Sequence, residues 1–255
     1  MKILFIGDTV GSAGCEFLRK NLPSLKNQKS IDIVIANGEN SADGNGITPM
    51  SASFLLESGA DVITTGNHVY RRPEFHGYLN ESEYVIRPAN YPEGAPGKGC
   101  VALDLGYTSL TVINIMGTVY MENLDCPFRT ADSILNGIGS KNIIVDFHAE
   151  ATSEKKAMGF YLDGRVSAVI GTHTHVQTSD ELLLPGGTAY MTDAGMTGPG
   201  LSVLGVEPSL AISKMKDKLP VRFDTAKSPC ELNGAVIELD HTTGKAKAIE
   251  RIIIR

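Results

Sequence analysis

The 255-residue sequence lacks the features that mark several large classes of protein. Its four cysteines are far apart and include no CxxC pair, so we expect free thiols. No apolar run approaches the ~18–20 residues that a transmembrane helix needs, so no membrane association is expected. The apolar part of the N-terminal stretch MKILFIGDTVG is too short for a signal peptide and is typical of a first strand. We therefore expect a cytoplasmic protein.

Positive charge is also scarce. The formal net charge is −6, and the sequence contains neither a run rich in lysine and arginine nor a basic aromatic patch. Tight, nonspecific binding of long nucleic acid is therefore not expected. A small or short anionic substrate is still compatible with this charge, because a bound metal ion can dominate the electrostatics of its own site.

Short apolar runs alternate with helical patterns in the first part of the chain. The runs at residues 3–6, 31–36, 62–65 and 143–147 are mostly β-branched or aromatic, which is typical of strands covered on both faces. Apolar stripes at helical spacing lie at residues 17–25 and 50–56, and Thr48 and Pro49 form a good start for the second. This alternation predicts an α/β fold with helices outside a sheet.

Antiparallel hairpins are predicted in the middle and at the end of the chain. They pair residues 101–105 with 110–115, residues 181–184 with 188–192, and residues 235–239 with 246–254. Two segments rich in glycine and proline, 87–99 and 193–209, are predicted to be irregular and are either rims or lids of a site or plain surface loops. Without repeats or a linker, residues 1–255 are expected to form one domain.

Polar side chains that can bind metal follow the carboxyl ends of five predicted strands, the fifth at residues 166–170. They are Asp8, Glu39, Asn40, Asn67, His68, His148, His173 and His175. In open α/β sheets, ligands bind at this edge. Simpler explanations exist for most of these side chains, since an aspartate can cap a helix, GEN can form a turn and a lone histidine can pack in a core. Two imidazoles at i and i+2 are harder to leave unpaired near a core.

The number of candidate ligands favours two metal ions. Three imidazoles, two carboxylates and two amides are too many for one tetrahedral zinc ion, but they suit two ions that share a carboxylate. Mixed nitrogen and oxygen ligands without cysteine favour manganese, iron or zinc. Two ions ~3.5–4 Å apart can clamp the oxygens of a phosphoryl displacement. His68, next to Asn67, is then placed to act as a general acid.

The strand-end series GD, GEN, GNH, H and GTHTH resembles the calcineurin-like metallophosphoesterases. Three departures from that pattern resemble its YmdB-type branch: Val10 stands two residues after Asp8 in place of a histidine, Glu39 replaces the usual bridging aspartate, and Val69 follows GNH. The segments IANGENSADGNGIT, DVITTGNHVY, VDFHAEATSEK and YMTDAGMTGP are similar to that branch as well, so the resemblance covers essentially the whole chain. It implies an α/β four-layer sandwich with central mixed β-sheets flanked by helices.

The resemblance also implies an activity and a set of ligands. The activity is hydrolysis of phosphodiester bonds, with 2′,3′-cyclic nucleotides or RNA ends as substrates, by a hydroxide held between two metal ions and with His68 as proton donor. The implied ions are two irons or iron with manganese, with manganese or zinc as further options. Matching the motifs assigns Asp8, Glu39, Asn40 and His175 to the first ion, Glu39 as the bridge, and Asn67, His148 and His173 to the second.

Two other functions stay open at this point. The same metal ions could hydrolyse another bond, such as an amide or a phosphomonoester, or the protein could bind a nucleotide with little turnover. His68 argues against a pure binding protein, which needs no proton donor beside its metal ions. A homo-oligomer formed by pairing of the late hairpins across subunits is a further option.

Overall fold

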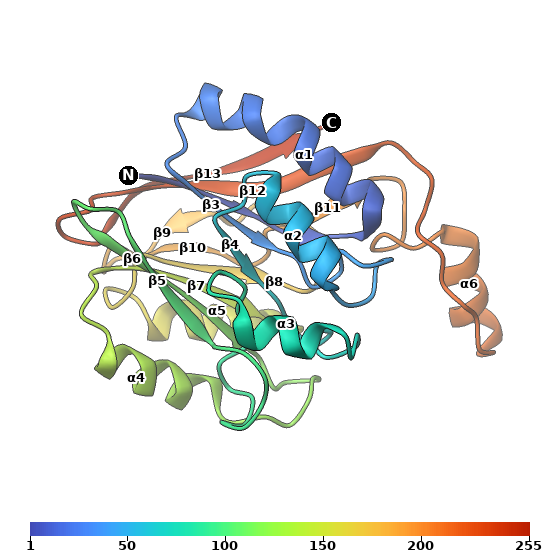
Figure 1. The fold of residues 1–255 in the computed structure, drawn as a ribbon, viewed down its shortest axis with the longest axis horizontal. Coiled ribbons are helices and arrows are strands. Elements are labelled where there is room, and N and C mark those ends of the chain that lie inside the picture. Colours follow the sequence, from blue (N-terminus) through green and yellow to red (C-terminus); the bar gives the residue numbers. More distant parts are fainter.

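Two β-sheets stacked face to face form the centre of this computed structural model, which describes residues 1–255 (Figure 1). The first sheet has the strand order β2-β11-β12-β1-β3-β4, and β13 also pairs with β12. Its strands are β1 (Lys2–Ile6), β2 (Asp8–Thr9), β3 (Ile33–Asn37), β4 (Val62–Thr64), β11 (Met196–Pro199), β12 (Cys230–Leu239) and β13 (Ala246–Ile254). Strands β1, β3 and β4 are parallel, whereas β12 is antiparallel to β1 and β13.

The second sheet has the strand order β5-β6-β7-β8-β10-β9. Its strands are β5 (Cys100–Asp104), β6 (Ser109–Met116), β7 (Asn142–His148), β8 (Ala168–Thr172), β9 (Leu182–Leu183) and β10 (Ala189–Met191). The four central strands are parallel, and β5 and β9 are antiparallel strands at the two edges. Both sheets are therefore mixed, as expected.

Helices cover the outer face of each sheet (Figure 1). Helices α1 (Gly11–Lys29), α2 (Pro49–Glu57) and α3 (Phe75–Glu81) pack on the first sheet, and α4 (Pro127–Gly137) and α5 (Thr152–Tyr161) pack on the second. Helix α6 (Pro208–Asp217) projects away from both sheets, at the right of Figure 1. The order helices, sheet, sheet, helices confirms the predicted four-layer sandwich. None of the helices is long and apolar enough to cross a membrane.

Strand β1 shows why the apolar runs are continuous. Ile3 and Phe5 face the core between the two sheets, whereas Leu4 and Ile6 face the core beneath the helices. Successive side chains of a strand point to opposite faces, so a strand buried on both faces must be apolar at every position. The same argument applies to β3, all five residues of which are buried.

Most of the elements predicted from the sequence are confirmed. The five predicted strands correspond to β1, β3, β4, β7 and β8, with ends that differ by at most two residues. Helix α2 begins at a capping box in which Thr48 and Ser51 satisfy each other's backbone N–H groups. The three hairpins form as β5–β6, β9–β10 and β12–β13, all within this chain.

One predicted loop is wrong in part. Segment 193–209 contains strand β11 and the start of α6, although its glycine-rich sequence predicts irregular structure. Strand β11 is stabilised by pairing with β12 and β2, which lie far away in the sequence and are invisible to a local pattern. Segment 87–99 contains no helix or strand of the fold, as predicted.

Candidate metal centre

The predicted site residues lie together where the carboxyl ends of strands from both sheets meet. Strands β1, β3 and β4 of the first sheet lead into Asp8, Glu39 and Asn67, respectively. Strand β7 of the second sheet ends at His148, and β8 leads into the segment 173–175. Glu39 from the first sheet lies 3.1 Å from His148 of the second, so the site spans both sheets.

Three side chains converge around one ring nitrogen of a fourth, His148. Its Nε2 atom lies 3.1 Å from Glu39 Oε1, 3.0 Å from Asn67 Oδ1 and 3.2 Å from His173 Nδ1. Glu39, His148 and His173 form the one group of at least three histidine, cysteine or acidic side chains with ligand atoms within 4.8 Å of one another. These four side chains are the ones expected to hold the second ion.

The side chains expected at the first ion converge less closely. His175 Nε2 lies 3.5 Å from Asp8 Oδ1. The amide nitrogen of Asn40 is 3.2 Å from both His175 Nε2 and Glu39 Oε1. Because an amide nitrogen cannot bind a metal ion, Asn40 can serve as a ligand only if its carboxamide group rotates so that the oxygen faces the ion.

Each imidazole of the cluster has a partner on its outer nitrogen. His148 Nδ1 lies 2.9 Å from the hydroxyl of Thr172, and that hydroxyl donates to Asp146 Oδ1 at 2.6 Å. The Thr172 oxygen must therefore accept from His148 Nδ1–H, which leaves Nε2 facing the cluster with its lone pair. Histidines that bind metal usually donate their other N–H in this way.

The other two imidazoles follow the same rule. His173 Nε2 lies 3.1 Å from Glu150 Oε2, so the ring donates outward and its Nδ1 atom faces the cluster. His175 Nδ1 lies 3.1 Å from the backbone oxygen of Leu204, so its Nε2 atom faces inward. In its neutral form, each of the three imidazoles thus has its unprotonated nitrogen facing the cluster.

Two further observations fit a bound cation. Asp8 Oδ1 is buried and accepts no hydrogen bond, although such an orphaned oxygen is costly inside a protein. At Gly66, a Cβ atom would overlap His148 Nε2 and Glu39 Oε2, so the glycine leaves space beside both ligand atoms. The donor set, its burial and the space around it therefore fit metal ions.

The electrostatics of the cluster favour positive charge. Burial raises the pKa of the Asp8 and Glu39 carboxyls, but the nearby histidines outweigh it, so both pKa values lie below their ordinary range. Burial lowers the pKa of His148, yet the charges of Glu39 and Asp8 raise it to about 9. Burial and then the charge of His148 lower the pKa of His173 to about 4. Without metal, one proton on His148 thus partly balances the two carboxylates.

His68 lies at the edge of the cluster and is more open to solvent, with 27% of its side chain exposed. Its backbone N–H donates to Glu39 Oε2 at 3.1 Å, and its Nδ1 atom lies 3.0 Å from Asn40 Oδ1. Its Nε2 atom makes no hydrogen bond within the chain. Burial lowers the pKa of His68, and the charge of Glu39 opposes this shift.

Sequence reasoning missed the outer partners of the histidines. Asp146 is buried in β7, two residues before His148 and therefore on the same face of the strand. A charged residue inside the otherwise apolar run 143–147 is a signal that could have revealed it. The simpler explanation of Asp8 as a helix cap is wrong, because α1 has Val10 at its N-cap and no side-chain cap.

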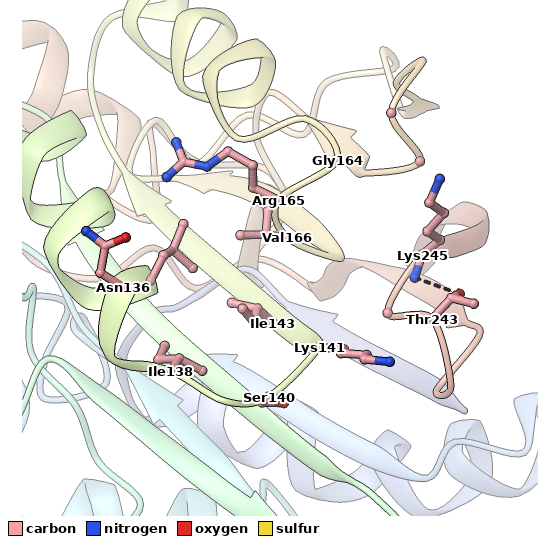
Figure 2. Close-up of a pocket in the computed structure, with 14 residues that line it drawn as sticks. Asn136, Ile138, Ser140, Lys141, Ile143, Gly164, Arg165, Val166, Thr243 and Lys245 are labelled. Carbon is pink, nitrogen blue, oxygen red and sulfur yellow. Dashed lines mark hydrogen bonds between the residues drawn. The ribbon is translucent and has the colours of Figure 1, made fainter.

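A cavity of about 420 Å³ lies at the other end of β7 and β8 and is not part of this cluster (Figure 2). Its cations do not converge on a common point. Arg165 bonds Asp132 at 2.6 Å, and Lys141 bonds the backbone oxygen of Thr242 at 3.4 Å. None of the predicted site residues lines this cavity.

Comparisons with known proteins show what this chain is similar to. A 2′,3′-cyclic-nucleotide 2′-phosphodiesterase of Bacillus subtilis (strain 168) is 47% identical over 256 residues, covering 100% of this chain and 97% of that protein. A crystal structure described as a novel phosphatase from Mycoplasma pneumoniae is 34% identical, covers 100% of this chain and 93% of that chain, and has a TM-score of 0.95.

A more distant structure shows how widely the fold occurs. The NAD nucleotidase of Haemophilus influenzae is 13% identical, with a TM-score of 0.60 over 100% of this chain and 55% of its own, and so shares the fold alone. The family model described as YmdB-like protein matches residues 4–252, nearly the entire sequence. The chain therefore belongs to the YmdB-like protein family.

Proposed function

We propose that this protein is a metal-dependent phosphodiesterase that hydrolyses 2′,3′-cyclic nucleotides. The observation that carries the proposal is the convergence of three imidazoles, each with its outer nitrogen bonded elsewhere, on two buried carboxylates. The similarity to the Bacillus subtilis phosphodiesterase supports the choice of substrate. A small cyclic nucleotide, or the cyclic phosphate at an RNA end, suits a protein of net charge −6, because metal ions bound at the site would attract anions there.

Two ions would be held by the side chains at the strand ends. Glu39, Asn67, His148 and His173 would hold one ion; Asp8, Glu39, Asn40 and His175 would hold the other, with Glu39 shared. Iron or manganese suits this mixture of nitrogen and oxygen ligands without cysteine. When bound, the ions would acidify a water molecule and offset the negative charge of the phosphate.

His68 would supply the proton to the leaving 2′ or 3′ oxygen. Its Nδ1 atom lies 3.0 Å from Asn40 Oδ1 before Asn40 turns towards an ion, and its Nε2 atom is free to donate. The lowered pKa makes the imidazolium a stronger acid, which favours transfer to an alkoxide. The charge of Glu39 opposes the effect of burial on this pKa.

A substrate panel tests the proposal. The protein is stripped with a chelator, reloaded with Mn²⁺ or Fe²⁺, and assayed with 2′,3′-cAMP, bis-p-nitrophenyl phosphate and p-nitrophenyl phosphate, with metal content measured in parallel. We expect turnover of the two diesters that is lost on chelation and restored on reloading. Faster turnover of the monoester would instead indicate a phosphomonoesterase. Nucleotide binding without product in the metal-loaded protein would indicate a binding protein.

The finer expectations stay predictions. They are the identity of the ions, a cytoplasmic location, one domain over residues 1–255, and assembly into a homo-oligomer. Elemental analysis of the purified protein and light scattering of the metal-loaded sample measure the first and the last of these directly.

A further inference from the structure

The backbone of the segment 173–175 is unusual at both histidines. His173 has a φ angle of 95° and His175 a φ angle of 62°, both in the left-handed region that residues other than glycine rarely adopt. Such conformations persist only where the surroundings hold them in place. Thr174 lies between the two histidines, so whatever holds Thr174 also sets the directions of both imidazoles.

Asp193 holds Thr174 through two hydrogen bonds. The backbone N–H and the hydroxyl of Thr174 both donate to Asp193 Oδ2, at 3.1 Å and 2.6 Å. The other carboxylate oxygen accepts from the backbone N–H of Gly195 at 2.8 Å. Asp193 is 0% exposed and follows β10, the strand next to β8, so it is anchored to the same sheet that carries the histidines.

Lys155 completes this arrangement from helix α5. Its Nζ atom lies 2.7 Å from Asp193 Oδ2 and 3.3 Å from the Thr174 hydroxyl, and the side chain is only 1% exposed. The aliphatic stem of Lys155 passes beside Gly171, where a Cβ atom would approach it to 3.1 Å. A buried ion pair is a poor source of stability, because the desolvation of both charges offsets their attraction. The pair is better explained by its hydrogen bonds to Thr174, which hold that residue in place.

We propose that Lys155 and Asp193 are positioning residues of the metal centre. They fix Thr174 in place, and Thr174 in turn fixes the left-handed backbone on either side and the separation of the two imidazoles. The inference rests on the proposed function, since it concerns metal binding, but it adds two residues that touch neither the proposed ions nor the cluster of ligand atoms. It also explains why a lysine is buried beside a site that attracts positive charge.

Titration of the metal-free protein with Mn²⁺, followed by the electron paramagnetic resonance signal of free Mn²⁺, tests this inference. Thr174→Val keeps the shape of the side chain and leaves the ion pair intact, and Lys155→Met removes the charge beneath it. We expect each variant to bind Mn²⁺ about 10-fold to 100-fold more weakly, as for other residues that orient metal ligands without binding the metal themselves. Thr188→Val is the matched control, because Thr188 is buried at the opposite end of β10 and its hydroxyl donates to the Val166 carbonyl at 2.6 Å.

A purely structural contribution gives a different result. Thr174→Val would then lower the melting temperature of the metal-free protein as Thr188→Val does, with wild-type affinity for Mn²⁺, and the proposal would be overturned. If Lys155→Met does not fold, the Mn²⁺ affinity of Thr174→Val is sufficient to test the inference. If the wild-type protein binds no Mn²⁺, both the proposed function and this inference are overturned. If the wild type and the variants bind Mn²⁺ with the same affinity, only the inference is overturned.

Discussion

The Nε2 atom of His148 lies 3.2 Å from the Nδ1 atom of His173. Both rings donate their other N–H outward, to Thr172 and Glu150, so two unprotonated nitrogens would face each other at this distance. Two lone pairs in contact repel unless a cation lies beside them. In the absence of metal, a proton on His148 supplies that cation, in accord with its raised pKa of about 9. A metal ion at this position would replace the proton.

Metal binding is therefore expected to release a proton from His148. Because its pKa is raised to about 9 in the metal-free protein, His148 is protonated at pH 7, and the ion must displace that proton. The apparent affinity for Mn²⁺ should rise by up to about tenfold per pH unit between pH 7 and 9 and level off above. Calorimetric titrations in buffers of different ionisation enthalpy measure the proton count. Equal heats in all buffers at pH 7.5 would contradict the expectation.

Replacing His68 should separate metal binding from catalysis. His68→Ala is expected to keep both metal ions and to lose roughly 10²- to 10⁴-fold in kcat towards 2′,3′-cAMP, the usual contribution of general acid catalysis. Elemental analysis and steady-state kinetics on the same sample check this. His76→Ala is the matched control, since His76 contacts Tyr70 rather than the cluster and its loss should leave kcat unchanged. Loss of metal with full activity per ion would make His68 a ligand instead.

Glu39 is expected to be the residue on which both ions depend. Glu39→Gln keeps the size of the side chain but removes the negative charge that His148 and His68 share. Metal affinity should fall by at least about tenfold, because losing a ligand costs no less than losing a residue that orients one. Glu231→Gln in β12 is the control for a glutamate substitution, because the Glu231 carboxylate bonds Asn233 and Arg255 rather than a residue of the cluster. Retention of both ions by Glu39→Gln would rule out a bridging carboxylate.

Thr172 should set the tautomer of His148. Thr172→Val removes the oxygen that accepts from His148 Nδ1–H and the hydroxyl that donates to Asp146. We expect the affinity for one of the two ions to fall about 10-fold to 100-fold and the affinity for the other to stay unchanged. Two-site Mn²⁺ titrations resolve the affinities, and nitrogen-15 NMR of the histidine rings reports the tautomer. Unchanged affinity at both sites would show that Thr172 only fills space.

The local elements and the kinds of ligand could be predicted from the sequence alone. Apolar runs such as residues 3–6 are strands because both faces are buried, and the capping residues at Thr48 start a helix through contacts a few positions apart. The chemistry of the strand ends was also visible, since the ligand types stand directly after each run. These features depend on neighbours in the sequence, which is why patterns of period 2 and 3.6 detect them.

How those ligands meet depends on the packing of the whole chain. The strands that carry Asp8 and Glu39 belong to one sheet and those that carry His148 and His173 to the other, and their contact results from packing the two sheets together. The ion pair that holds Thr174 and the strand β11 depend in the same way on long-range contacts. Contacts between positions far apart in the chain are selected by the packing of the whole core, and no local pattern encodes them.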